Sequence, residues 1–128
     1  LFRSSIAFTG ASLASSYLPP LYVPKGALFK RAVLRVDEAF NVTGTSPTLI
    51  FGGTAPATNG IVLTEAELEA IGTKTPASTG AGTWAQGSAT GTTASERVTK
   101  TLGGTSPVIA TNVGKATLTL EFFYKTKV

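Results

Sequence analysis

The strongest strand pattern in this chain is ALFKRAVLRVDEAF, at residues 27–40. Apolar residues recur at every second position of its centre: Ala32, Leu34 and Val36. The positions beside them carry two charges: Arg31, Val33 and Arg35. A period of two sends successive side chains to opposite faces of a strand. The pattern therefore predicts a half-buried antiparallel strand, with a core on one face and a polar surface on the other.

The final segment, residues 116–124, shows the same period. One face is predicted to hold Ala116, Leu118, Leu120, Phe122 and Tyr124. The other face is predicted to hold Thr117, Thr119, Glu121 and Phe123. Because these two segments are the best-formed strands of the chain, we expect them side by side at the centre of one sheet of an antiparallel sandwich.

Shorter β-rich runs fill most of the remaining chain. They are predicted at residues 48–51, 61–63, 83–85, 95–102 and 107–111. Turn or loop signals separate them at residues 41–47, 59–60, 73–82, 103–104 and 112–115. Trp84 is expected to anchor the core. About eight strands at this spacing predict an all-β fold, an antiparallel β-sandwich.

Residues 64–71 form the one helical candidate. Thr64 and Glu67 have the spacing of a capping box, and Gly72 suits a C-terminal stop. Three carboxylates fall in this segment: Glu65, Glu67 and Glu69. A spacing of two residues fans them around a helix axis, so we expect solvated side chains near a helix N-terminus and no metal site.

Residues 1–24 are predicted to form an extended N-terminal arm, and residues 25–128 a single sandwich domain. The adjacent Pro19 and Pro20 favour a polyproline-like conformation and exclude a helix or a central strand. Such an arm packs over its own core, contacts a neighbouring subunit or binds a proline-recognition module, and we favour the first two. The candidate partner-interface residues are Phe2, Arg3, Tyr17, Leu18, Leu21 and Tyr22. Because the chain starts at Leu1 without Met, we expect residues upstream to have been cleaved or left out of this sequence.

Composition excludes most enzyme classes. The chain has no His, Cys or Met, so the usual residues for proton transfer, thiol chemistry and transition-metal binding are missing. No Ser-x-x-Lys motif or phosphate-binding loop compensates for them. We therefore expect no enzyme activity, no catalytic residue, no cofactor and no metal. No apolar run approaches the ~18 residues of a membrane-spanning helix, so no membrane partner is expected.

The chain is mildly basic, with a net charge of +4 and a pI of about 9.6. The densest group of positive charges is Lys30, Arg31 and Arg35, and aromatic residues do not interleave with it. Because single-stranded nucleic-acid sites combine basic grooves with stacking aromatics, we expect no direct nucleic-acid binding. A basic surface of this kind also suits an acidic protein partner.

Two stretches resemble a known family. They are residues 33–41 followed by residues 49–53, and the Gly-Lys turn at 114–115 that leads into residues 116–124. Both are similar to jelly-roll cement (decoration) proteins of tailed double-stranded DNA bacteriophages. The resemblance implies a β-sandwich with the jelly-roll connectivity of about eight strands. It also implies a homo-oligomer, a dimer or trimer, on the outer capsid surface of the virion. It implies binding to the major capsid protein, stabilisation of contacts between capsid subunits, and no catalysis.

Two other functions fit the same strand chemistry. One is a phage tail or head-fibre component, which shares similar strands. The other is a carbohydrate- or receptor-binding module, in which Tyr17, Tyr22 or Trp84 supplies an aromatic platform. The sequence leaves open the oligomeric state, the symmetry axis occupied and the residues that contact the partner.

Overall fold

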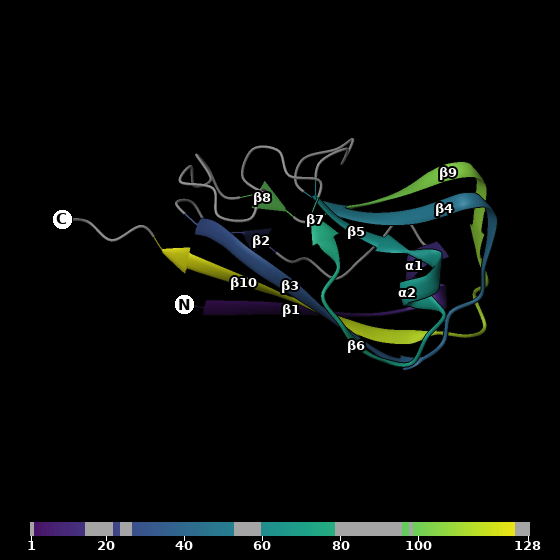
Figure 1. Ribbon diagram of the computed structural model, residues 1–128, viewed down its shortest axis with the longest axis horizontal. Coiled ribbons are helices and arrows are strands. Elements are labelled where there is room, and N and C mark those ends of the chain that lie inside the picture. Colours follow the sequence, from purple (N-terminus) through teal and green to yellow (C-terminus); the bar gives the residue numbers. More distant parts are fainter. Residues whose placement is uncertain are drawn as a thin grey trace.

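The chain folds into two antiparallel four-stranded sheets, which confirms the predicted all-β sandwich (Figure 1). The computed structural model describes residues 2–14, 22–23, 27–52, 60–78, 96–97 and 99–124. The strands are β1 (Phe2–Thr9), β2 (Tyr22–Val23), β3 (Ala27–Glu38), β4 (Val42–Gly52), β5 (Gly60–Thr64), β6 (Gly72–Lys74), β7 (Ala77–Ser78), β8 (Glu96–Arg97), β9 (Thr99–Ile109) and β10 (Lys115–Tyr124). The helices are α1 (Gly10–Ala14) and α2 (Glu65–Leu68).

Each sheet has a defined strand order. The order in the first, called sheet I, is β1-β10-β3-β6, and the order in the second, called sheet II, is β7-β5-β4-β9. A separate two-stranded pair joins β2 to β8. The predicted adjacency of the two best-formed strands is confirmed, because β3 and β10 pair at the centre of sheet I.

The predicted inward faces of β3 and β10 form the floor of the core. Leu34 and Leu118 are opposite one another in the register and have no exposed surface. Sheet II contributes Leu49 and Phe51, which are also fully buried. Aromatic rings cross the core, with the Phe8 and Phe51 centroids 5.3 Å apart. Every second residue is buried from Ala32 to Val36 and from Ala116 to Phe122, so the period of two predicts which face of these strands packs in the core.

The predicted N-terminal arm is wrong for its first residues. Residues Phe2–Thr9 are strand β1, which pairs with β10 along its whole length and buries Ile6 and Phe8. Residues Gly10–Ala14 form helix α1, whose Leu13 carbonyl accepts a 2.7 Å hydrogen bond from the Lys100 ammonium of β9. These elements therefore belong to the sandwich. Only two alternating residues of β1 are buried, Ile6 and Phe8, and so short a pattern does not predict a strand from the sequence. The strand is recognised only from its pairing with β10.

Helix α2 is shorter than predicted, although its capping box is confirmed. The Thr64 hydroxyl accepts from the Glu67 backbone N–H at 3.2 Å, and the Glu67 carboxylate accepts from the Thr64 N–H at 3.0 Å. The helix ends at Leu68, whose carbonyl accepts from the Phe40 N–H at 3.1 Å. That carbonyl is therefore satisfied by the chain between β3 and β4, and Gly72 begins β6 instead of ending the helix.

Strands β4 and β9 continue without interruption through segments that were predicted to be turns. The sequence Gly-Thr-Ser-Pro occurs twice, at residues 44–47 of β4 and 104–107 of β9. The two copies are opposite one another, with Thr45 paired to Thr105. On one side of this pair β9 carries one extra residue, and on the other side β4 does, so the register is restored. We call this arrangement the twin bulge.

The twin bulge explains why Gly, Ser and Pro are tolerated inside strands. Both glycines and both serines have positive φ angles: Gly44 +123°, Gly104 +98°, Ser46 +49° and Ser106 +50°. Bulges bend strands and release Pro from the ladder. Figure 1 shows β4 and β9 bending together at the end of sheet II. Each copy of Gly-Thr-Ser-Pro taken alone favours a turn. Because the two copies pair with each other, β4 and β9 instead form a continuous two-stranded ribbon.

The predicted surface loop over residues 73–82 is also partly wrong. It contains most of β6, which pairs with β3 at one edge of sheet I, and all of β7, which pairs with β5 at one edge of sheet II. Such short edge strands carry too few residues for a period to be recognised. The predicted strand at 83–85, with Trp84, lies outside the described residues.

Candidate interaction surface

The outer face of sheet I collects most of the charged side chains of the described chain. Its basic members are Arg3, Lys30, Arg31, Arg35 and Lys115. Its acidic members are Asp37, Glu38 and Glu121. Five basic residues against three acidic ones leave this face positive by two charges. The face is therefore suited to an acidic partner.

A row of three charged residues crosses three strands at one end of this face. Arg3 of β1, Glu121 of β10 and Arg31 of β3 are directly opposite one another in the strand register. The Arg3 Nε donates to Glu121 Oε2 at 2.6 Å, and the Arg31 Nε donates to Glu121 Oε1. The Glu121 side chain is only 3% exposed, whereas those of Arg3 and Arg31 are 62% and 47% exposed. The arginines cover the carboxylate and keep their own charge at the surface.

The two arginines set the ionisation of Glu121. Hydrogen bonds from Arg31 and then Arg3 lower the pKa of this carboxyl to about 2 from an ordinary value of 4.5, against an opposing effect of desolvation. Glu121 therefore stays negative at every pH well above 2. Both guanidinium groups are held by a carboxylate that does not titrate near neutrality.

A β-bulge adds a second positive charge beside Arg31. The register between β3 and β10 shifts after the Glu121–Arg31 pair, so that Phe122 pairs with Phe29 and Lys30 is the extra residue. Phe29 and Ala32 both face the core, which leaves Lys30 and Arg31 on the outer face. The Lys30 Nζ lies 5.4 Å from the centre of the Phe123 ring, a cation–π distance.

These five residues form one surface feature. We call Arg3, Lys30, Arg31, Glu121 and Phe123 the arginine cluster. Phe123 is 43% exposed, which gives the cluster an apolar flank. The arrangement combines exposed guanidinium groups, an ammonium and a ring, so it is equipped to bind an anionic group attached to a larger molecule.

The other end of the same face is closer to electrical balance. Arg35 Nε donates to Asp37 Oδ1 at 3.1 Å, and both side chains are at least half exposed. Between the two ends lies an uncharged row in which the Ser5 and Thr119 hydroxyls are 2.9 Å apart. The excess positive charge is therefore concentrated at the arginine cluster.

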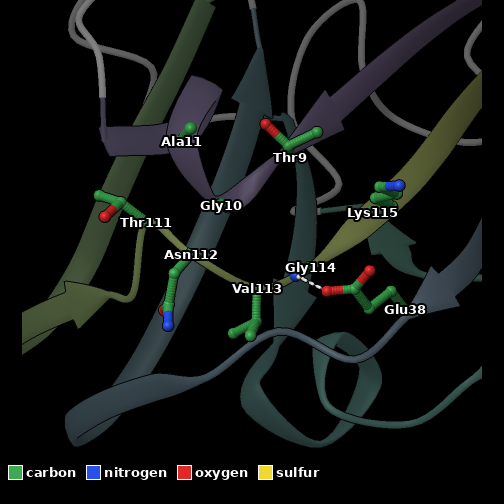
Figure 2. A pocket seen from close by; sticks show the side chains of 9 residues that line it. All are labelled: Thr9, Gly10, Ala11, Glu38, Thr111, Asn112, Val113, Gly114 and Lys115. Carbon is green, nitrogen blue, oxygen red and sulfur yellow. Dashed lines mark hydrogen bonds between the residues drawn. The ribbon is translucent and has the colours of Figure 1, made fainter.

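An open polar groove of about 380 Å³ lies at the junction of β1 and α1, beside the turn at residues 111–114. Figure 2 shows Glu38 pointing to the backbone of Gly114, whose N–H donates to Glu38 Oε1 at 3.1 Å. The Gly10 N–H donates to the Gly114 carbonyl at 3.2 Å. The polar groups of the groove therefore join α1 and β3 to the turn that precedes β10. No cluster of side chains converges on a ligand position in the residues drawn there.

Two acidic side chains at α2 accept hydrogen bonds from backbone N–H groups of the fold. Glu67 caps the helix, and Glu69 Oε2 accepts from the Val42 N–H at 3.1 Å. Within the described ranges, no group of three or more His, Cys, Asp or Glu side chains is placed to hold a metal ion. No helix in the same ranges is long and apolar enough to cross a membrane.

The predicted interface residues are placed as follows. Arg3 belongs to the arginine cluster. Phe2 pairs through its backbone with Phe122, and Tyr22 pairs through its backbone with Arg97; the side chains of Phe2 and Tyr22 lie outside the described part. Three others are outside it entirely: Tyr17, Leu18 and Leu21.

Sequence reasoning noticed the basic group on β3 but missed Glu121 as its partner. The available signal was the interrupted period: Phe29 and Ala32 are three residues apart, which places Lys30 and Arg31 together on one face. The pairing with Glu121 depends on the register of β10, which no local pattern gives.

No protein-family model, curated protein or solved structure matches this chain.

Proposed function

We propose that this chain is a structural virion protein, a cement protein that binds the outside of a phage capsid and stabilises contacts between major capsid protein subunits. The observation that carries the proposal is the exposed arginine cluster, which is built across three strands of a rigid sheet. A protein that joins others needs a fixed, partly charged contact surface more than a reactive site. The outer face of sheet I supplies such a surface.

The strand order supports the jelly-roll part of the proposal. In an eight-stranded jelly roll, one sheet has the order 1-8-3-6 and the other 2-7-4-5. Sheet I matches the first order when β10 is counted as the eighth strand. In sheet II, β9, β4 and β5 take the places of strands 7, 4 and 5. Strand β2 takes the place of strand 2, because it pairs with β8 just before β9 begins. Strand β7 is then an added edge strand.

The edge of sheet I supports a homo-oligomer. Among the described strands, β1 is an edge strand of eight residues, and its register with β10 has no shift. It contains no Pro, Lys or bulge, the usual devices that guard exposed edges, and Arg3 is its one charged residue. Pairing of β1 between two copies would extend sheet I into a continuous sheet. Sedimentation equilibrium tests this part: a monomer at every accessible concentration would contradict it.

Binding to particles tests the function. Capsids assembled without the chain are mixed with the purified protein and sedimented, and we expect saturable binding with a fixed ratio of chain to capsid protein. The double variant R3Q/R31Q should bind weakly. A matched control, T111E/N112D, changes the net charge by the same two units on an exposed turn away from the cluster and should bind normally.

Other outcomes would favour the other candidates. If the protein stays in the supernatant with capsids but sediments with tails or fibres, it is a tail or fibre component. If it binds neither and instead retains glycans on an array, it is a carbohydrate-binding module. Either result would overturn the cement proposal.

A further inference from the structure

We infer that the arginine cluster is a carboxylate-binding site, in which the guanidinium groups of Arg3 and Arg31 hold an Asp or Glu side chain of an acidic protein segment. The inference rests on the proposed function for the identity of the partner, but its chemistry is argued from the cluster itself.

The first argument is the supply of donors. A guanidinium has five N–H donors, and each arginine uses its Nε to bind Glu121. Within the described contacts, the Nη atoms of Arg3 and Arg31 make no hydrogen bond. Each side chain therefore presents four N–H donors in a planar fork whose geometry matches a carboxylate.

The second argument is preorganisation. Glu121 is buried, ionised and opposite both arginines in the register, so it holds the two guanidinium groups in one row. Long side chains that are already ordered lose less conformational entropy when they bind. The bulge at Lys30 adds a third cation to the same spot, beside the ring of Phe123.

The third argument is the extent of the charge. A nucleic acid presents a continuous line of phosphates and needs positive charge along its path. Here the cluster is bordered by an uncharged row containing Ser5 and Thr119, and beyond it Arg35 is paired with Asp37. The site is therefore matched to a local group of carboxylates on a protein and not to a nucleic-acid backbone.

The test measures binding of a fluorescein-labelled hexaglutamate peptide to the whole chain by fluorescence anisotropy at low ionic strength. We expect R3K/R31K, which keeps the net charge and loses the planar forks, to weaken binding by about tenfold. R35K, the same exchange at the balanced end of the face, should change binding by less than about twofold. Far-UV circular dichroism of each variant confirms that it is folded at the assay temperature.

Three outcomes would overturn the inference. Equal binding by wild type and R3K/R31K would show that unspecific charge attraction is responsible. An equal loss in R35K would show that the whole face acts without a defined site. Tighter binding of a twelve-nucleotide oligothymidylate than of hexaglutamate would make the ligand a nucleic acid.

The inference and the proposed function can fail separately. Hexaglutamate binding that depends on the arginine forks, in a chain that never sediments with capsids, would retain the site and reject the cement function. Capsid binding that is unchanged in R3K/R31K would retain the cement function and reject the site.

Discussion

The twin bulge predicts that Gly44→Ala is severely destabilising. Gly44 has a φ of +123°, where a residue with a side chain is strained by about 1–3 kcal/mol. An added Cβ would also lie 2.8 Å from the Ser106 carbonyl oxygen and 2.9 Å from that of Thr105. Because these are backbone atoms of the paired strand, they can move only by opening the ribbon, at a cost of about 1–3 kcal/mol more.

Gly72 offers a matched control for this substitution. Its φ is +126°, but an added Cβ would meet no atom within 4 Å. Gly72→Ala therefore introduces the backbone strain without the close contact. We expect it to lose about 1–3 kcal/mol, and Gly44→Ala to lose about 2–6 kcal/mol, of a total stability of order 5–15 kcal/mol.

Urea unfolding followed by far-UV circular dichroism measures both losses. Gly104→Ala should behave like Gly44→Ala, since its Cβ would lie 2.6 Å from the Ser46 carbonyl oxygen. The double variant at Gly44 and Gly104 should lose less than the sum of the single losses, because both open the same ribbon. If Gly44→Ala is no more destabilising than Gly72→Ala, the close packing of the two bulges does not stabilise the fold.

Three further predictions follow from the described contacts. Because the folded pKa of Glu121 is about 2 against an ordinary 4.5, its contribution to stability is complete above about pH 4.5 and is lost as the pH falls towards 2. The stability difference between wild type and Glu121→Gln should therefore shrink over that range in urea titrations, and a constant difference would refute the assignment. Leu118→Ala, at a fully buried site, should cost about 2–5 kcal/mol of unfolding free energy, and a loss below 1 kcal/mol would contradict a packed core. Thr64→Ala removes the helix cap and should cost about 1 kcal/mol by the same measurement, whereas no loss would mean that the capping box is dispensable.

The sequence was sufficient where side-chain period decides the structure. Strand β10 and the central residues Ala32–Val36 of β3 alternate without a break, so the faces of both strands and their central place were predictable. The twin bulge was not, because Gly-Thr-Ser-Pro favours a turn wherever it is considered alone. The two copies, at residues 44–47 and 104–107, pair in antiparallel orientation. The extra residue in one strand offsets the extra residue in the other, so both strands remain in the sheet. The identical tetrapeptides were a usable signal that period analysis does not detect.

The candidate site was predictable in part. Arg3 was expected at an interface because it lay in a supposed arm. It is at the surface for a different reason, because it lies on the outer face of β1, opposite Glu121. The basic group on β3 was visible in the sequence. The contact of these basic residues with Glu121 was not visible there. It depends on the register of three strands, which places Glu121 between Arg3 and Arg31.

The most direct test of the account is cryo-electron microscopy of capsids reconstituted with the purified chain. We predict density for the sandwich on the outer capsid surface, with the outer face of sheet I against the major capsid protein and an acidic side chain of that protein between Arg3 and Arg31. Density in which sheet I faces solvent, or particles whose capsids carry no added density at saturating protein, would contradict the central claim.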